Sequence, residues 1–500
     1  MPSNIWRCEG PKNSYKYSIF PSAPINNLGV TAVTPMCKIN TLPRELLTDI
    51  FEYAVCPRLS EWDTLWQSTP VLHRTLSLAR VCLAWHAIVI STPSLWTIIN
   101  GHPTPSTLRR AWNLSSESNT PLRIGLNPFW RSPRERQEYH EAVKDFCLQI
   151  HRTAFLDIHI HAHDLALFFD HLSELGDAPV LEYFRVKPSY PTTYLIPESI
   201  FGGKPLPPLR YIELEFCTIS WRSPLLQGPK LSTLKLGYQP RLSYTLMLDV
   251  FQNMQALEVL SLTHCLPNPP PEVIHDGAVY LPRLKHLELL EDDIESYESF
   301  LRTANCAPTT MRIITSPRSP NRRVPQFFNV LGRRVSARRA IKILKIDEDG
   351  GLQLEGWTSS SSATPPNFTI AIPSSSRHGQ MLTTALTKLP FHALRTLYFY
   401  SPFVSSLGVA ALSRRLPKLT KVELSRRSTL PLCQVFSQHL SCSVIPFWGA
   451  AQVGIWSPSR IRDYGRLSVH IEQVEEARRA GGRPIFFVER GNDPLRHRRL

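Results

Sequence analysis

The clearest concentration of potential metal ligands in this sequence is the segment HIHAHD, residues 159–164. His159, His161 and His163 alternate along it and Asp164 follows them, and imidazole and carboxylate groups are common zinc ligands. Alternate residues of a strand point to the same face. Three such histidines would bind one zinc ion only if the backbone bent and a further ligand joined them. We therefore expect a polar rim on the protein surface here and no metal site.

Residue patterns of known catalytic centres do not occur in the chain. It contains no GxGxxG, Walker, GxSxG or HExxH segment, and no nucleophile, base and orienting group can be matched within it. The ten cysteines form no CxxC pair and have no zinc-ligand spacing, so we expect them to be reduced and mostly buried. The sequence predicts a protein that is not an enzyme, with no catalytic residues and no cofactor.

Charge is the next feature that bears on function, because the formal net charge is +15. No Asp or Glu lies between Ser299 and Ile346, whereas eleven Arg and Lys lie there. A solvated basic face is the ordinary explanation. An acidic or phosphorylated segment could also dock there, because clustered guanidinium groups pair bidentately with phosphate. Basic residues are spread along the whole chain, so we do not expect nucleic acid as the partner, although the end RHRRL, residues 496–500, fits a nuclear signal.

Length and hydropathy set the broad class. The chain has 500 residues, 42% of them hydrophobic, enough for a large core and more than one domain. Its N-terminus lacks the apolar core of a signal peptide, and the most apolar run, residues 81–90, is too short to span a bilayer. We expect an intracellular protein, cytoplasmic or nuclear or both, with no membrane partner. Residues 1–38 are polar and aperiodic, which predicts a flexible leader.

A leucine pattern recurs through most of the remaining chain. Residues 209–219, LRYIELEFCTI, match every defined position of the leucine-rich-repeat template L-x-x-L-x-L-x-x-N/C-x-L, with Ile in two Leu slots. The clear repeats begin at positions 155, 181, 209, 231, 257, 284, 394 and 419. Between 155 and 284 the steps are 22 to 28 residues, and this spacing predicts weaker repeats near 311, 340 and 367.

Stacking of these repeats predicts the fold. One repeat buries too little apolar surface to fold alone, whereas stacked repeats share one core. We predict an α/β protein in which residues 155–445 form a leucine-rich-repeat solenoid with a parallel sheet, interrupted by a Ser/Pro-rich insertion at 357–367. Residues 101–154 would connect and cap it, with a strand at 121–126. Residues 446–500 would form the other cap, with a helix at 471–480, a closing strand and a basic tail. An irregular α/β domain is the alternative.

Two helical patterns precede the repeats. In TLPRELLTDIFEYA, residues 41–54, apolar residues recur every three or four positions, and Pro43 suits a helix start. A second helix is expected over 76–90, and SLW, residues 94–96, closes the unit. A helical unit of this size cannot bury so many large apolar groups, which indicates a partner site. Alternatively, these residues pack only on the repeat domain.

Residues 39–100 resemble an F-box. The resemblance rests on Leu42-Pro43 before the first helix, on the Leu-Leu and Ile-Phe pairs within it, and on LARVCLAWHAIVISTPSLW, residues 78–96. A long interruption between Cys56 and Thr75 departs from the motif and is expected to be a loop. The order of F-box, strand and repeats is similar to that of the F-box proteins of mushroom-forming fungi. The adaptor-binding residues that the resemblance implies are Leu42, Pro43, Leu46, Ile50, Phe51, Val81, Cys82, Trp85, Leu95 and Trp96.

This resemblance implies a function. An F-box of this kind docks on the Skp-type adaptor of a cullin–RING (SCF-type) ubiquitin ligase, and the repeats would bind an unknown protein substrate. Two other functions stay open. One is a leucine-rich-repeat scaffold that binds the adaptor without a role in ubiquitination, and the other is a nucleic-acid-binding protein that uses residues 299–346.

Overall fold

The computed structural model describes residues 38–55, 71–100, 104–118, 120–127, 133–189, 193–240, 244–267, 279–291, 293–306, 308–315, 324–336, 340–347, 351–373, 378–400, 416, 418–424, 452–456, 464–480 and 486–490. Most of the predicted leader, residues 57–70 of the loop expected between Cys56 and Thr75, and the basic end RHRRL lie outside these ranges. Residues 71–74 of that expected loop are helical, in α3 (Val71–Leu78). By its contacts the chain divides into two units, residues 1–47 and residues 48–500, and the boundary falls within helix α1 (Arg44–Val55).

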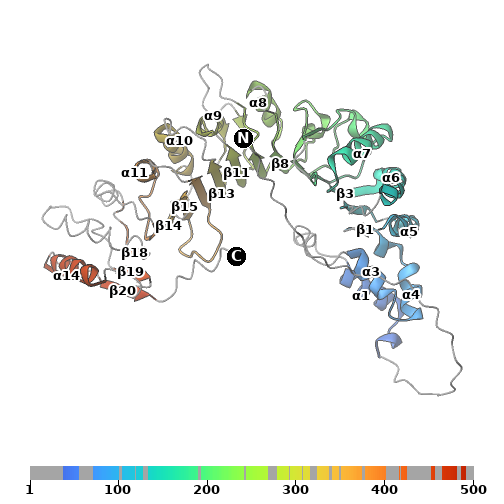
Figure 1. The fold of residues 1–500 in the computed structure, drawn as a ribbon, viewed down its shortest axis with the longest axis horizontal. Coiled ribbons are helices and arrows are strands. Elements are labelled where there is room, and N and C mark those ends of the chain that lie inside the picture. Colours follow the sequence, from blue (N-terminus) through green and yellow to red (C-terminus); the bar gives the residue numbers. More distant parts are fainter. Residues whose placement is uncertain are drawn as a thin grey trace. The chain divides into compact units, whose positions relative to one another are not determined.

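The second unit is a mixed α/β fold built on one large, mostly parallel sheet (Figure 1). Within the described ranges every neighbouring pair of its strands is parallel except the two pairs that β15 makes. This confirms the predicted α/β class and parallel sheet. In spatial order the 16 strands are β1 (Ile98–Ile99), β2 (Leu122–Leu126), β3 (Thr153–Ile158), β4 (Tyr183–Val186), β6 (Tyr211–Glu215), β8 (Thr233–Gly237), β9 (Val259–Thr263), β11 (His286–Glu291), β13 (Thr310–Thr315), β16 (Phe368–Pro373), β15 (Gly351–Trp357), β14 (Ile343–Asp347), β17 (Thr396–Tyr400), β18 (Lys421–Leu424), β19 (Gln452–Trp456) and β20 (Phe486–Arg490).

The leucine pattern explains these strands. In β6 the two apolar template positions, Ile212 and Leu214, are buried. The residues that alternate with them, Tyr211, Glu213 and Glu215, lie on the other face and are less buried. The parallel register places Ile212 beside Leu234 and Leu234 beside Leu260, so the inward side chains form continuous rows across the sheet. Fully burying one such side chain stabilises the fold by about 1.5–3 kcal/mol. No strand could be this apolar without a neighbour to cover it.

Helices between the strands lie on one side of the sheet (Figure 1). Consecutive helices pack on one another, α5 on α6, α6 on α7, α9 on α10 and α10 on α11. The helices are α5 (Pro105–Ser115), α6 (Pro133–Cys147), α7 (Ala162–Glu174), α8 (Tyr244–Gln252), α9 (Ile294–Thr303), α10 (Val324–Ser336), α11 (His378–Lys388) and α14 (Tyr464–Ala480). Two further sheets have two strands each. One pairs β10 (Val279–Tyr280) with β12 (Ala304–Asn305), and the other pairs β5 (Tyr194–Leu195) with β7 (Cys217–Thr218). No helix in the described ranges has the length and apolar character needed to cross a bilayer.

The N-terminal helices differ from the prediction at one point. Helix α1 forms as expected, but the single helix predicted over 76–90 is two helices, α3 (Val71–Leu78) and α4 (Leu83–Ile90). Cys82 is extended, with φ −161° and ψ 169°, and it precedes α4 as its N-cap residue. Apolar periodicity continues through this break, and so the sequence pattern could not reveal it. A short 3₁₀ helix, η3 (Pro93–Trp96), follows α4.

The weak repeats predicted near 340 and 367 form strands, β14 and β16, but these strands do not follow the chain order of the other repeats. Strand β13 pairs with β16, followed by β15 and β14, so the chain order is reversed there. Only three residues separate β14 from β15, which is too few for a parallel crossover and forces an antiparallel pair. The Ser/Pro-rich insertion is the connection from β15 to β16, and within it Trp357 Nε1 donates to the Thr364 carbonyl at 2.7 Å.

Both expected caps contain more regular structure than predicted. Residues 101–154 hold α5, β2 and α6, and the sheet already begins at β1 in the N-terminal segment. At the other end β19 and β20 continue the parallel sheet, and β20 is the closing strand that the sequence predicted. The helix predicted at 471–480 is the second half of α14.

The described cysteines support the expectation of free, mostly buried thiols. Cys147, Cys217, Cys265 and Cys306 are buried, and Cys82 is half-buried. Burial raises the thiol pKa to about 12 for Cys147, Cys217 and Cys265, and to about 11 for Cys306. We expect iodoacetamide at pH 8 to modify Cys82 in the folded protein and to leave the four buried cysteines unmodified. Peptide mass spectrometry measures this directly.

These raised pKa values also predict a loss of stability at alkaline pH. The folded state keeps the thiol protons that the unfolded state releases, so this contribution is complete below the unfolded pKa of about 9 and is lost towards pH 12. Each buried thiol lowers the free energy of unfolding by up to about 1.4 kcal/mol per pH unit in this window. Urea unfolding at pH 8 and pH 10 checks the sign. Equal stability at both values, or alkylation of the four thiols at pH 8, would contradict the placement.

Candidate functional site

The helical segment that precedes the sheet is held together by a small apolar core. The Phe51 ring on α1 packs on the Trp85 ring of α4, with centroids 4.7 Å apart. Trp96 of η3 is fully buried, and its Nε1 donates to the Val89 carbonyl at 2.9 Å. Ser94 Oγ donates to the Glu52 carboxylate, which joins η3 to α1. These contacts fix α1, α4 and η3 relative to one another.

Large apolar side chains nevertheless remain exposed on this segment. Ile50 and Tyr53 of α1 are 43% and 78% exposed, Val81 in the turn before α4 is 58% exposed, and Leu83, the first residue of α4, is 89% exposed. We call these four residues the exposed apolar residues. Phe51, next to Ile50 in α1, contacts Trp85, which lies two residues beyond Leu83 in α4. Exposure at this density is typical of a partner site.

The predicted adaptor-binding residues separate into surface and interior groups. Ile50 and Val81 are exposed, and Cys82 and Trp85 are half-buried. In the first unit, Leu46 is exposed, Pro43 is exposed and Leu42 is half-buried. Phe51, Leu95 and Trp96 are buried, so their side chains are not on the surface.

Two exposed residues were missed by sequence reasoning. Tyr53 lies three residues beyond Ile50 on α1, and this spacing could have identified it. Leu83 was hidden because residues 76–90 were expected to be one helix, whereas the break at Cys82 leaves Leu83 in the solvent.

A second candidate surface is the face of the sheet opposite the apolar rows. The register aligns Asp157, Arg185, Glu213 and Lys235 in one row across β3, β4, β6 and β8, which we call the charge ladder. Arg185 lies 3.6 Å from Asp157 and 3.3 Å from Glu213, and Lys235 lies 3.4 Å from Glu213. Each charge has an opposite neighbour. The row therefore compensates itself and leaves little net field for a strongly charged partner.

An aromatic row runs beside the charge ladder. The rings of Phe155, Tyr183 and Tyr211 stack with centroids 3.9 and 4.1 Å apart. Burial first, and then the Glu213 carboxylate, raises the pKa of Tyr211, so its hydroxyl stays protonated and donates to Glu213. Burial lowers the pKa of Arg185, but the nearby Asp157 and Glu213 carboxylates raise it by more. The pKa of Arg185 therefore lies above its usual value, and the guanidinium stays charged. The result is a pre-organised surface on which stacked rings lie beside paired charges.

The segment HIHAHD borders this surface at one end. His159 lines a hollow of about 290 Å³ together with Leu126, Asn127, Asp157, Arg185 and Lys187. His161 is the N-cap residue of α7, and the His163 side chain lies outside the described part of the chain. Asp164 is buried and bonded to Arg136 at 2.6 Å and to His140 at 2.9 Å. In the described residues, no three His, Cys, Asp or Glu side chains gather as a metal-binding group.

The N/C slot of the template carries a structural function that was only partly recognised. Cys217 and Cys265 occupy it in two repeats, and Gln239 occupies it in the repeat between them. The buried Gln239 amide donates to the Cys217 carbonyl at 2.5 Å and accepts from the Ile219 N–H at 2.9 Å. Counting eight residues from Leu231 would have identified Gln239. The slot thus joins neighbouring repeats through backbone groups: Gln239 binds Cys217 and Ile219, and the Cys265 thiol donates to the Leu236 carbonyl.

We expect Gln239→Leu to lower the free energy of unfolding by about 2 kcal/mol, because it leaves a buried N–H and a buried carbonyl unpaired. Hydrogen exchange of the peptide that contains Ile219 measures the effect locally. The matched control is Gln227→Leu, because the exposed Gln227 amide donates to the Arg222 carbonyl at the surface. Its loss should lower the free energy of unfolding by less than about 0.5 kcal/mol. Equal exchange in the two variants would contradict the assignment.

Basic residues of the stretch 299–346 are distributed over several elements in the described ranges. Two of them pair with acids on the strand face, and one pairs within a helix. Arg334 instead donates to the Leu301 and Arg302 carbonyls at the end of α9, both at 2.8 Å. These residues therefore have different roles and do not form one solvated face. The pairs are Arg302–Glu298 at 2.7 Å, Arg312–Glu288 at 2.9 Å and Lys345–Glu355 at 3.3 Å.

Comparison with known proteins gives no relative that assigns these surfaces. No protein-family model matches the chain, and no curated protein matches it.

Proposed function

We propose that the chain is a substrate-recognition subunit of a cullin–RING ubiquitin ligase. Its N-terminal helical segment would act as an F-box that docks on a Skp-type adaptor. Its strand-and-helix repeats would act as a leucine-rich-repeat solenoid that binds a target protein. Catalysis would come from the associated ligase, and this chain would supply proximity and specificity.

The observation that carries the proposal is the group of exposed apolar residues, Ile50, Tyr53, Val81 and Leu83. Leaving them in water forgoes burial of about 25 cal/mol per Å² of apolar surface. The core beneath them is complete without them, because Phe51 and Trp96 are already buried. A folded unit that keeps such residues on its surface is explained by a protein partner that covers them.

The strand face supports the second half of the proposal. Rigid aromatic and arginine side chains are the groups that dominate protein interfaces, and Tyr183, Tyr211 and Arg185 are held in place by their neighbours. Pre-organised side chains lose little entropy when a partner binds. The compensated charges of the ladder favour a protein surface over the phosphate backbone of nucleic acid, which needs uncompensated cations.

Affinity purification tests the proposal in cells. The protein is captured with the ligase held assembled and the proteasome blocked, and the co-purifying proteins are identified by mass spectrometry. We expect the adaptor, a cullin and at least one protein that accumulates when the proteasome is blocked. Absence of both adaptor and cullin would contradict the proposal.

The other functions predict different outcomes of the same experiment. A scaffold would recover the adaptor without any protein that accumulates on proteasome inhibition. A nucleic-acid-binding protein would instead retain RNA or DNA, with binding that falls steeply as salt rises.

A further inference from the structure

The residues just before β9, β11, β14 and β17 occupy equivalent positions at one edge of the large sheet. They are Glu258, Lys285, Lys342 and Arg395, and we call them, together with Arg210 before β6, the strand-start row. The Glu258 carbonyl accepts from the Lys285 N–H at 2.7 Å, and the Lys342 carbonyl accepts from the Arg395 N–H at 2.8 Å in the same way. Side chains of such neighbours reach one another, since Lys285 Nζ lies 2.6 Å from a Glu258 carboxylate oxygen.

Lys342 and Arg395 are neighbours of the same charge in this row. Arg395 is exposed and Lys342 is half-buried, and among the described residues neither lies within ion-pair distance of a carboxylate. The segments that supply them, residues 299–346 and 356–422, contain no Asp or Glu. Like charges beside one another on neighbouring strands destabilise a sheet. At this place the row lacks the acid that it has elsewhere, and an anion between the two cations would stabilise it.

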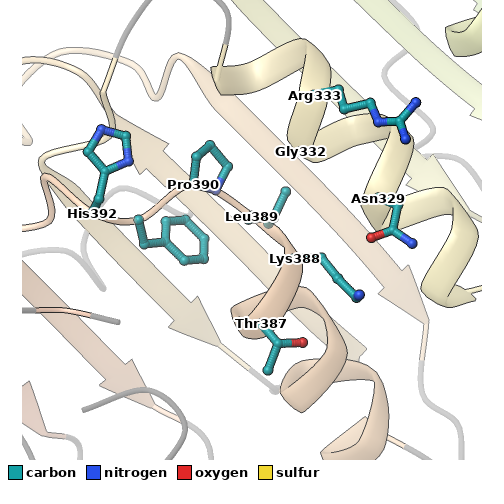
Figure 2. A pocket seen from close by; sticks show the side chains of 9 residues that line it. Asn329, Gly332, Arg333, Thr387, Lys388, Leu389, Pro390 and His392 are labelled. Atoms are coloured by element: carbon teal, nitrogen blue, oxygen red, sulfur yellow. The ribbon is translucent and has the colours of Figure 1, made fainter. Parts of the chain in front are cut away.

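The backbone that carries Arg395 is firmly anchored. Figure 2 shows residues 387–392 leaving the end of α11 beside Gly332 of α10, on the way to β17. A Cβ atom built on Gly332 would lie 2.5 Å from the Lys388 carbonyl oxygen, so only glycine permits this approach of the two segments. On the other side, Arg395 is bonded to the Lys342 carbonyl. The two cations are therefore presented from fixed positions.

The Ser/Pro-rich connection from β15 to β16, residues 358–367, leaves the sheet at the same edge. It begins beside the strand-start row, because the Lys342 N–H donates to the Trp357 carbonyl at 2.8 Å. Asn367 closes its base, since the Asn367 Oδ1 accepts from the Thr358 N–H at 3.0 Å. The connection is thus a short loop whose two ends are held together next to Lys342.

Ser360 is the hydroxyl of this loop best placed for modification. Ser360 and Ser361 are both exposed, but the Ser361 hydroxyl accepts from the Ala363 N–H at 3.1 Å. In the described part of the chain the Ser360 hydroxyl has no hydrogen-bond partner. Three residues beyond the end of β15, it has a reach of up to about 10 Å. Lys342 lies one strand from that end and Arg395 two strands, at about 5 Å for each strand, so both cations are within reach.

We propose that Ser360 is a phosphorylation site and that its phosphate binds Lys342 and Arg395. A bond forms between Ser360 Oγ and the γ-phosphorus of ATP held by a protein kinase, while the bond from that phosphorus to the β–γ bridging oxygen breaks. The hydroxyl proton passes to the base of the kinase and ADP leaves. The phosphate then carries nearly two negative charges and three acceptor oxygens, which suits an ammonium and a guanidinium group side by side.

The phosphate acts within this chain. A group on a short tethered loop has an effective concentration in the millimolar range near the cations, so it competes well with separate anions. Serine is neutral before modification, and the loop is therefore linked to β14 and β17 only after phosphorylation. This link involves no adaptor or target protein, and the inference stands apart from the ligase proposal.

The test uses purified full-length protein with phosphoserine in place of Ser360, introduced by stop-codon suppression. A ³¹P NMR titration measures the second pKa of the phosphate. We expect this pKa to lie at least about 0.5 pH units below its ordinary value of about 6, because neighbouring cations stabilise the dianion. Lys342→Met and Arg395→Met should each raise it towards about 6. The matched control is Arg210→Met, which removes an exposed cation of the same row six strands from β15 and should leave the pKa unchanged.

Modification in cells is measured separately. The protein is isolated from its own cells with phosphatases inhibited and is digested with trypsin. Cleavage after Lys345 and Arg377 releases the whole loop in one peptide, residues 346–377. We expect a phosphorylated form of this peptide, with fragment ions that place the phosphate on Ser360.

Three results would overturn the proposal. A phosphate pKa of about 6 in the chain with both cations would show that the phosphate does not bind them. An equal rise in pKa in Arg210→Met would show diffuse charge attraction. A peptide without phosphate on Ser360 would show that this residue is not a modification site. Thermal unfolding checks that each variant folds, and Lys342→Gln is the milder change if Lys342→Met does not.

Discussion

Replacing Trp96 by alanine is expected to lower the local free energy of unfolding of the helical segment by about 3–5 kcal/mol. The indole is fully buried, and the variant both creates a cavity and removes one of two donors to the Val89 carbonyl, which keeps the Thr92 N–H at 3.4 Å. Native-state hydrogen exchange of peptides from α3 and α4 measures the effect where it occurs.

The control for this prediction is Val81→Ala. The Val81 side chain is exposed, so its truncation should change the exchange free energy by less than about 0.5 kcal/mol. A Trp96 variant as stable as the Val81 variant would show that Trp96 is not part of the core. Because Trp96→Ala destabilises the segment that carries the exposed apolar residues, it cannot separate a loss of partner binding from a loss of folding.

The second large effect is expected from Arg185→Met. Arg185 lies between Asp157 and Glu213, and its side chain is 22% exposed. Removal of the guanidinium takes away the cation between the nearly buried Asp157 carboxylate and the Glu213 carboxylate. We expect this to lower the free energy of unfolding by about 2–4 kcal/mol. Urea unfolding measures the loss, and hydrogen exchange in β3 and β4 locates it.

An exposed ion pair supplies the comparison. Lys204 lies 3.4 Å from Asp177, and both side chains are more than half exposed. Lys204→Met should change stability by no more than about 0.5 kcal/mol. If the two variants were equally stable, the charge ladder would not be a structural element.

Much of the fold was predictable because one local pattern repeats. Leu209, Ile212 and Leu214 define a strand by themselves, and recurrence of that spacing fixes its parallel neighbours. The same rule could not detect β15, because GLQLEGW lies outside the repeat and pairs antiparallel through a three-residue connection. Nor could it detect the break before Leu83, where apolar residues continue without a change of period.

Candidate surfaces were predictable only in part. Residue type placed Ile50, Phe51 and Trp96 in one list, but whether each is inside or outside depends on tertiary packing. The charge ladder joins Asp157, Arg185 and Glu213 from three separate repeats, which becomes visible only when the strand register is known. The close approach of Gly332 to the Lys388 carbonyl joins two residues that no sequence spacing connects.

The central claim is that the exposed apolar residues bind a Skp-type adaptor, and calorimetric titration of the purified chain with the purified adaptor tests it most directly. We expect submicromolar binding by the natural chain and a loss of at least about a hundredfold in Ile50→Glu and in Leu83→Glu, with unchanged thermal unfolding. Leu195→Glu, at an apolar position 63% exposed on β5, is the matched control and should bind normally. No binding by the natural chain, or equal affinity in all three variants, would contradict the claim.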